Sequence, residues 1–202
     1  MSDLRLEGYL TPLSRLAQLY DFTASGNKIL GGIPQGYFTL IRLQFLNLHN
    51  NQLTLTPEIT SANSIISVLS LGNNLFEGTI PESLSMLNGL VKLNLGHNMF
   101  DGTIPSSYYL LTTLESLKLE SNMLTGTIPA LDQSRLRSID LSQNYLTMGS
   151  LQEVPLSTFS ASALAMDIDL RSNCLVFSNP SKPSQNVTAT RCGGEQVYQN
   201  GC

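Results

Sequence analysis

One spacing dominates this sequence: an asparagine recurs about every two dozen residues, each time shortly after two alternating apolar residues. The pattern L-x-x-L-x-L-x-x-N-x-L fits residues 90–100 and fits residues 114–124 again. Five close copies and two looser ones place the recurring residue at Asn27, Asn51, Asn74, Asn98, Asn122, Asn144 and Asn173. Successive differences are 24, 23, 24, 24, 22 and 29 residues. So steady a period predicts a stack of repeats, because no single repeat of this length could bury its apolar face alone.

Each part of the repeat has a physical reason. The L-x-L alternation predicts a short strand with its leucines on one face, and successive strands should stack in parallel about 4.8 Å apart. The asparagine follows the strand, where its amide can both donate to and accept from backbone groups that the turn leaves unpaired. We therefore expect these seven residues to form a buried asparagine ladder. The alternative is a row of ordinary surface turn residues, which would have no reason to keep this register.

A second motif follows three of the asparagines. Gly-Thr-Ile-Pro stands at residues 78–81, 102–105 and 126–129. The combined motif N-x-L-x-G-x-I-P resembles the plant-type subfamily of leucine-rich repeats, which includes receptor-kinase ectodomains and polygalacturonase-inhibiting proteins. The resemblance implies a leucine-rich-repeat solenoid, a right-handed β-α/3-10 superhelix with short parallel strands on the concave face and loops and 3-10 turns on the convex face.

In that family the G-x-I-P half of each repeat adds a second short strand, and the resemblance implies the same here. Two repeats depart from the motif. The repeat at 43–53 lacks the glycine, and the repeat at 136–146 lacks the Ile-Pro. We expect the second sheet to be interrupted at both.

The two ends differ in composition from the repeats. We predict a repeat array over residues 1–175, with about seven repeats and a partial N-terminal one, and a capping segment with the start of a Cys-rich region over residues 176–202. Cys174 and Cys192 are expected to form a disulfide that folds 175–191 over the last coil, the alternative being two free thiols. Asn186 begins an Asn-Val-Thr glycosylation sequon. Cysteines and sequon together favour an extracellular or cell-surface setting, although Met1 is followed by charged residues and not by a signal peptide.

Composition and residue spacing exclude several functions. With 11 basic and 15 acidic residues, the net charge of −4 argues against a nucleic-acid binder. No apolar run approaches the roughly 20 residues that cross a bilayer. His49 and His97 lie two repeats apart, about 10 Å at strand spacing, which is too far for one metal ion. We find no catalytic constellation and no cofactor motif, and we expect a non-catalytic chain.

Residues between the core leucines should point to the concave face. Candidate ligand-binding residues there are Phe45, Asn47, His49, Asn94, Lys118, Glu120, Asp140, Asp169 and Arg171. Lys118 and Asp140 should lie about 5 Å apart on neighbouring strands and form an ion pair. We interpret the chain as a recognition module for a protein, peptide or glycan, as in a receptor-like ectodomain. The alternatives are an intracellular scaffold and, by resemblance, an inhibitor of a secreted glycosidase.

Overall fold

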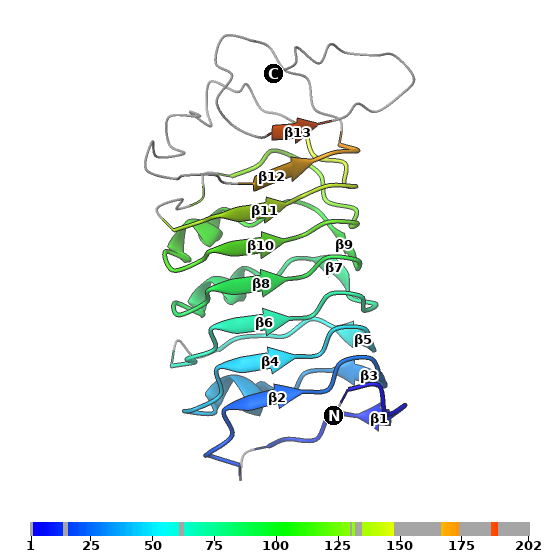
Figure 1. Cartoon of the computed structure of the whole chain (residues 1–202), viewed down its shortest axis with the longest axis vertical. Coiled ribbons are helices and arrows are strands. Elements are labelled where there is room, and N and C mark those ends of the chain that lie inside the picture. Colours follow the sequence, from blue (N-terminus) through cyan, green and yellow to red (C-terminus); the bar gives the residue numbers. More distant parts are fainter. Residues whose placement is uncertain are drawn as a thin grey trace.

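The chain coils into a stack of repeats, which a computed structural model describes for residues 2–13, 16–60, 63–129, 131, 135–147, 167–173 and 187–189. Figure 1 shows the strands of successive repeats lying one above another from the N-terminal to the C-terminal end. Cys174, Cys192 and Asn186 lie outside the described residues, as does most of the predicted capping segment.

One parallel sheet runs through the whole stack, and we call it the main sheet. Its order is β13-β12-β11-β10-β8-β6-β4-β2, so each strand pairs with the strand of the next repeat. Equivalent residues pair, for example Leu69 with Leu93 and Leu93 with Leu117. The strands are β2 (Asp21–Thr23), β4 (Phe45–Asn47), β6 (Val68–Ser70), β8 (Lys92–Asn94), β10 (Ser116–Lys118), β11 (Ser138–Asp140), β12 (Asp167–Leu170) and β13 (Val187–Ala189). β13 lies within the segment predicted as a cap, and it extends the main sheet by pairing with β12.

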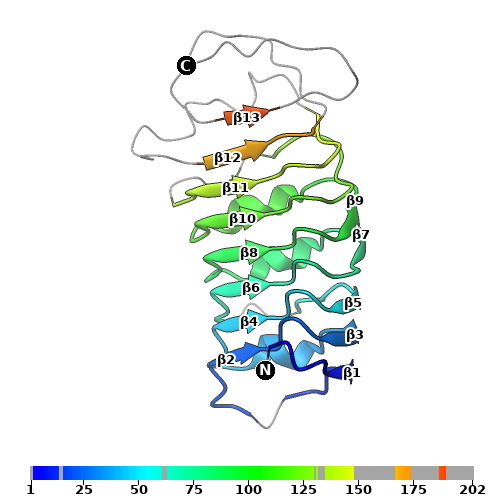
Figure 2. The same ribbon diagram turned by 45° about the vertical axis from the view of Figure 1, so that its right-hand side comes forward.

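A second set of short strands forms another side of the coil, which we call the flank (Figure 2). Its sheets are β1-β3-β5 and β7-β9. The strands are β1 (Glu7–Tyr9), β3 (Lys28–Gly32), β5 (Gln52–Leu55), β7 (Glu77–Thr79) and β9 (Met99–Asp101). The 3-10 helices η1 (Gln35–Thr39), η2 (Glu82–Met86) and η3 (Ser106–Leu110) lie behind the main sheet, each directly after the proline of its repeat (Figure 1).

The predicted interruption of the second sheet at the repeat of 43–53 falls directly after the strand of that repeat, because the sheet β1-β3-β5 ends there and β7-β9 is a separate sheet. β5 pairs with β3, with a register shift between Gly31 and Gly32. Backbone hydrogen bonds continue beyond both departures: the Leu75 N–H donates to the Leu53 carbonyl, and the Tyr145 N–H donates to that of Leu124. Pairing on the flank depends on backbone groups that any residue type supplies, so it does not need the full motif.

The leucines of the main sheet and the second residue after each asparagine from Asn27 to Asn144 share one continuous core. Leu46, Leu69 and Leu117 have no exposed surface. Phe76 and Phe100 stack with ring centroids 5.9 Å apart behind the flank. The core therefore crosses every boundary between neighbouring repeats.

The asparagines at the end of each main-sheet strand are buried and bridge neighbouring repeats. The Asn98 amide nitrogen donates to the carbonyls of Leu95, at 3.0 Å, and of Leu71 in the preceding repeat, at 3.1 Å. Its amide oxygen accepts from the Phe76 N–H of that repeat, at 3.2 Å. The residue before it, His97, turns the chain with a left-handed φ of 54°. Asn51, Asn74, Asn122, Asn144 and Asn173 make the same donor and acceptor contacts.

Candidate functional site on the main sheet

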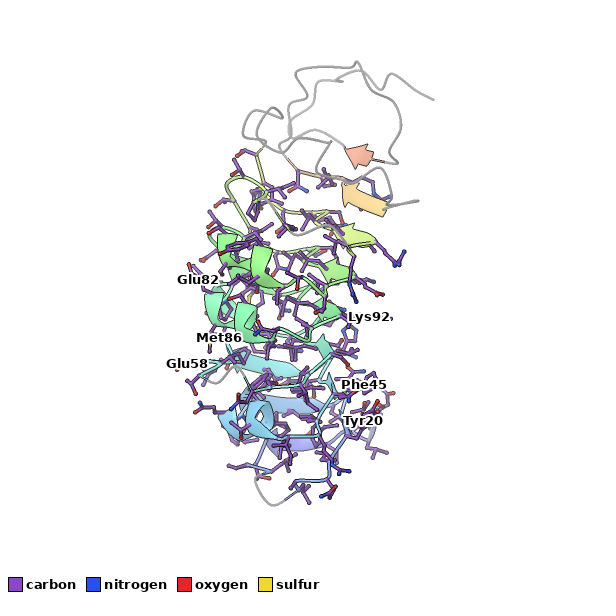
Figure 3. The ribbon with its side chains drawn as sticks, turned by 90° about the vertical axis from the view of Figure 1, so that its left-hand side faces the viewer. Tyr20, Phe45, Glu58, Glu82, Met86 and Lys92 are labelled. Atoms are coloured by element: carbon purple, nitrogen blue, oxygen red, sulfur yellow. The ribbon has the colours of Figure 1, made fainter. Side chains whose placement is uncertain are left out.

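The outer face of the main sheet carries the candidate residues in columns that run along the stack. In each strand the middle residue is a core residue, and its two neighbours point outward. The strand register aligns Phe45 with Val68 and Val68 with Lys92 in one column. Figure 3 shows Tyr20, Phe45 and Lys92 on this face and Glu58, Glu82 and Met86 on the opposite side of the coil.

An aromatic patch occupies the N-terminal part of this face. The rings of Tyr20 and Phe45 lie 5.3 Å apart between centroids at a tilted angle, and Tyr20 is 50% exposed. Val68 extends the apolar surface to the next strand, and the exposed Lys92 follows it. Sequence analysis did not select Tyr20. The sequence could have indicated Tyr20, because it is an aromatic residue at a repeat position where the next two repeats have the polar residues Gln44 and Ser67.

The middle of the face is narrow and polar. The Asn94 amide oxygen accepts from the Gly96 N–H at 3.0 Å, and Asn47 accepts from the His49 N–H at 3.1 Å. A methyl group on Gly72 would lie only 2.7 Å from the Asn94 amide oxygen and 3.0 Å from His49 Nδ1. The glycine therefore leaves the space in which these two side chains converge.

Glu120 begins the charged part of the face. Its carboxylate lies over Gly96, where a methyl group would come within 2.4 Å of the carboxylate carbon. Burial raises the pKa of the Glu120 carboxyl above its ordinary value, and the Asp140 carboxylate acts in the same direction. A backbone hydrogen bond and the charges of Lys118 and His97 lower that pKa again. Its Oε2 atom is buried and has no hydrogen-bond partner among the described residues.

The predicted ion pair between Lys118 and Asp140 is not formed. The two residues are neighbours in the strand register, as expected. However, Asp140 Oδ1 accepts from the Ser142 hydroxyl at 2.7 Å and from the Ser142 N–H at 3.1 Å, while Lys118 is exposed. A donor two residues along the same strand costs less side-chain entropy to hold than a lysine on the next strand.

Asp169 in β12 and Arg171 in the turn that follows do form an ion pair. Arg171 Nε lies 3.0 and 2.9 Å from the two carboxylate oxygens of Asp169. The guanidinium lowers the pKa of the Asp169 carboxyl, and the carboxylate raises that of Arg171. Among the candidate residues, these two largely satisfy each other.

Metal-binding and membrane-spanning features were sought in the part of the chain that the structure describes. It contains no group of three or more His, Cys, Asp or Glu residues that could hold a metal ion. None of its helices is long and apolar enough to cross a bilayer. The face thus offers a shaped surface of aromatic, amide and charged groups.

Comparison with known proteins agrees with this architecture. The profile of the Leucine Rich Repeat family matches residues 42–62, 66–87 and 89–111. The chain carries leucine-rich repeats. No curated protein sequence matches this leucine-rich-repeat chain significantly.

Solved structures with similar folds include plant receptors. The leucine-rich-repeat ectodomain of the Arabidopsis receptor kinase HAESA, in complex with an N-terminally lengthened IDA peptide hormone ligand, has a TM-score of 0.70 and 31% identity, over 84% of this chain and 28% of that one. The ectodomain of the membrane receptor kinase GASSHO1/SCHENGEN3 from Arabidopsis thaliana, with CASPARIAN STRIP INTEGRITY FACTOR 2, has a TM-score of 0.59 and 27% identity, over 86% and 24%.

A plant ice-binding protein has a TM-score of 0.76 and 22% identity, over 96% of this chain and 64% of that one, which shows the shared fold alone. This leucine-rich-repeat chain spans about a quarter of the length of the two receptor ectodomains. It therefore resembles plant receptor ectodomains in fold and in repeat type.

Proposed function

We propose that the main-sheet face is a non-catalytic recognition surface that binds an extended peptide or protein segment. The observation that carries the proposal is the Tyr20–Phe45 aromatic pair, in which Tyr20 is half exposed and Phe45 partly buried, with Val68 and Lys92 beside it on the main sheet. Partly exposed aromatic residues commonly anchor protein interfaces. The IDA peptide hormone bound by the HAESA ectodomain supports the same class of ligand.

The spacing of the patch specifies the ligand chemistry. Phe45 and Lys92 lie two strands apart, about 10 Å at ordinary strand spacing. An extended peptide advances about 3.3 Å per residue, so its apolar side chain and a carboxylate about three residues away would reach both.

Binding can be tested with peptides selected from a random display library on the intact chain. Tyr20→Ala and Phe45→Ala should each weaken binding of the selected peptides at least about tenfold, as a central aromatic anchor does. Tyr109→Ala is the matched control, because Tyr109 on η3 is 56% exposed where Tyr20 is 50% exposed. Unchanged affinity in Phe45→Ala, Asn94→Ala, Lys118→Ala and Asp140→Ala would exclude this face.

The cellular setting is part of the proposal. A receptor-like ectodomain would carry a glycan on Asn186 and a Cys174–Cys192 disulfide, whereas an intracellular scaffold would have neither. Expression through a secretory pathway, followed by peptide mapping without reduction and with a glycosidase, distinguishes the two. Selective binding of pectic oligosaccharides or of a secreted glycosidase, with no peptide selected, would favour the glycan or inhibitor alternative.

A further inference from the structure

A row of exposed apolar side chains lies on the flank, away from the main-sheet face. Directly after the ladder asparagine, four successive repeats carry an apolar residue, and we call these residues the flank strip: Leu75, Met99, Met123 and Tyr145. Leu75 and Met123 are each 44% exposed and Tyr145 is 59% exposed, while Met99 is half-buried. Isolated exposed leucines are ordinary, but a contiguous row of large apolar residues marks an interaction surface.

The asparagine ladder holds this strip outward. In the repeat of Asn74, the asparagine and Phe76 point into the core, so Leu75 between them must point out. The same alternation holds at Met99, which lies between the buried Asn98 and Phe100. The strip is also spaced by the backbone, because the N–H groups of Met99 and Met123 donate to the carbonyls of Phe76 and Phe100 at 2.8 Å. It is therefore a preformed row with one side chain per repeat.

Two carboxylates border the strip. Glu77 pairs in register with Met99, and Asp101 adjoins Phe100, whose carbonyl binds the Met123 N–H. Both carboxylates are exposed, and neither takes part in an ion pair within the described residues. Farther along the flank, by contrast, Glu7 already pairs with Lys28 at 2.7 Å. The strip thus combines apolar side chains with two unneutralised negative charges.

We propose that the flank strip docks an amphipathic α-helix of another protein, with one apolar residue per turn and lysine or arginine beside that apolar row. An α-helix advances about 5.4 Å per turn, close to the roughly 4.8 Å between stacked strands, so a helix parallel to the stack meets each repeat with one side chain. Basic residues of the helix neutralise Glu77 and Asp101. A second copy in a two-fold contact would instead bring this acidic border against itself.

The probe is a synthetic helical peptide with leucines at i, i+4, i+7 and i+11 and lysines beside them, titrated against the intact chain by fluorescence anisotropy. The Glu77→Lys/Asp101→Lys variant should weaken binding at least about tenfold, and the same peptide with glutamates in place of lysines should recover it. Glu58→Lys/Glu82→Lys is the matched control, since it makes the same change in net charge at two exposed carboxylates on the side of the coil away from the main sheet, outside the flank strip. Met123→Ser should weaken the binding of the lysine peptide to the wild type and of the glutamate peptide to the Glu77→Lys/Asp101→Lys variant.

Equal affinities of the lysine peptide for the Glu77→Lys/Asp101→Lys and Glu58→Lys/Glu82→Lys variants would overturn the proposal, as would no binding of the lysine peptide at millimolar concentration. A dimer in sedimentation analysis that Met123→Ser dissociates, without peptide binding, would assign the strip to a second copy instead. Tyr20→Ala, which alters the main-sheet face, should leave binding of the lysine peptide unchanged. This result separates the flank proposal from the proposal for the main-sheet face.

Discussion

At the scale of the residue, the ladder asparagine is selected by the two ends of its side chain. Asn98 donates with its nitrogen to the carbonyls of Leu71 and Leu95, on both sides of the repeat boundary, and accepts with its oxygen from the Phe76 N–H. Aspartate has nearly the same shape but cannot donate, so it would leave both carbonyls facing a carboxylate. The periodic position of asparagine was visible in the sequence because this need recurs at every turn.

Asn98→Asp should lower the free energy of unfolding by about 3 kcal/mol, since buried polar groups lose their partners. Urea unfolding followed by circular dichroism measures the change. Asn50→Asp is the control: Asn50 is exposed in the turn that precedes the ladder residue Asn51, and the change there should stay within about 0.5 kcal/mol. Equal losses in both variants would mean that Asn98 is merely a turn residue.

Glu120 gives the chain a pH dependence with a defined sign. Its pKa is raised in the folded state, so its contribution to stability is present below the pKa of the unfolded chain, about 4.3, and is lost as pH rises through the folded value. Glu120→Gln should therefore stabilise the chain relative to the wild type more at pH 7 than at pH 4. Denaturant titrations from pH 3 to 8 test this.

Asp169→Asn is a control, because the pH dependence of stability that Asp169 causes has the opposite sign. Arg171 lowers the pKa of Asp169, so that contribution is present above the unfolded pKa and is lost as pH falls. Asp169→Asn should therefore lower the free energy of unfolding at pH 7 and change it little at pH 3. For Glu120, the opposite result would be a free energy of unfolding that changes with pH in parallel for Glu120→Gln and the wild type. It would show that the Glu120 carboxylate is not desolvated.

At the scale of the element, sequence periodicity was sufficient for the main sheet but not for the flank. The main-sheet strands pair equivalent residues, so a single spacing predicts both the strand and its partner. On the flank, Glu77 pairs with Met99, a residue two positions earlier in its own repeat. This stagger follows from the three-dimensional path of the coil, and a one-dimensional alignment of repeats does not contain it.

The hydrogen-bond partners of side chains on the main-sheet face could not be predicted from the sequence either. The register placed Lys118 beside Asp140 correctly, but the partner of Asp140 was decided by Ser142, a local competitor. The flank strip was overlooked because its residues immediately follow the asparagines, where apolar residues can serve the core or the surface equally well. The structure decides between core and surface because both neighbours of such a residue, as at Leu75, are buried.

The 3-10 helix η3 contains a hydroxyl group that costs stability. Tyr108 is 1% exposed, its hydroxyl has no hydrogen-bond partner among the described residues, and burial raises its pKa. Tyr108→Phe should therefore raise the free energy of unfolding by about 1 kcal/mol, because the orphaned polar group is removed and the ring is kept. Tyr108→Leu, which removes packing as well, should lower it. A loss of stability in Tyr108→Phe would mean that the hydroxyl has a partner.

At the scale of the whole molecule, each repeat contacts only its neighbours, so stability should be distributed along the stack and damage should remain local. Leu93→Ala in β8 removes a side chain that is 1% exposed and should cost about 3 kcal/mol, whereas Leu110→Ala, at 45% exposure, should cost far less. Hydrogen exchange can locate the loss. The amides of Leu71 and Leu95, which bond across the boundaries beside β8, should lose more protection than those of Ala24 and Leu141 farther along the stack. Equal loss at all four amides would show that the solenoid unfolds as one cooperative unit, and the nearest-neighbour description would then not apply to this chain.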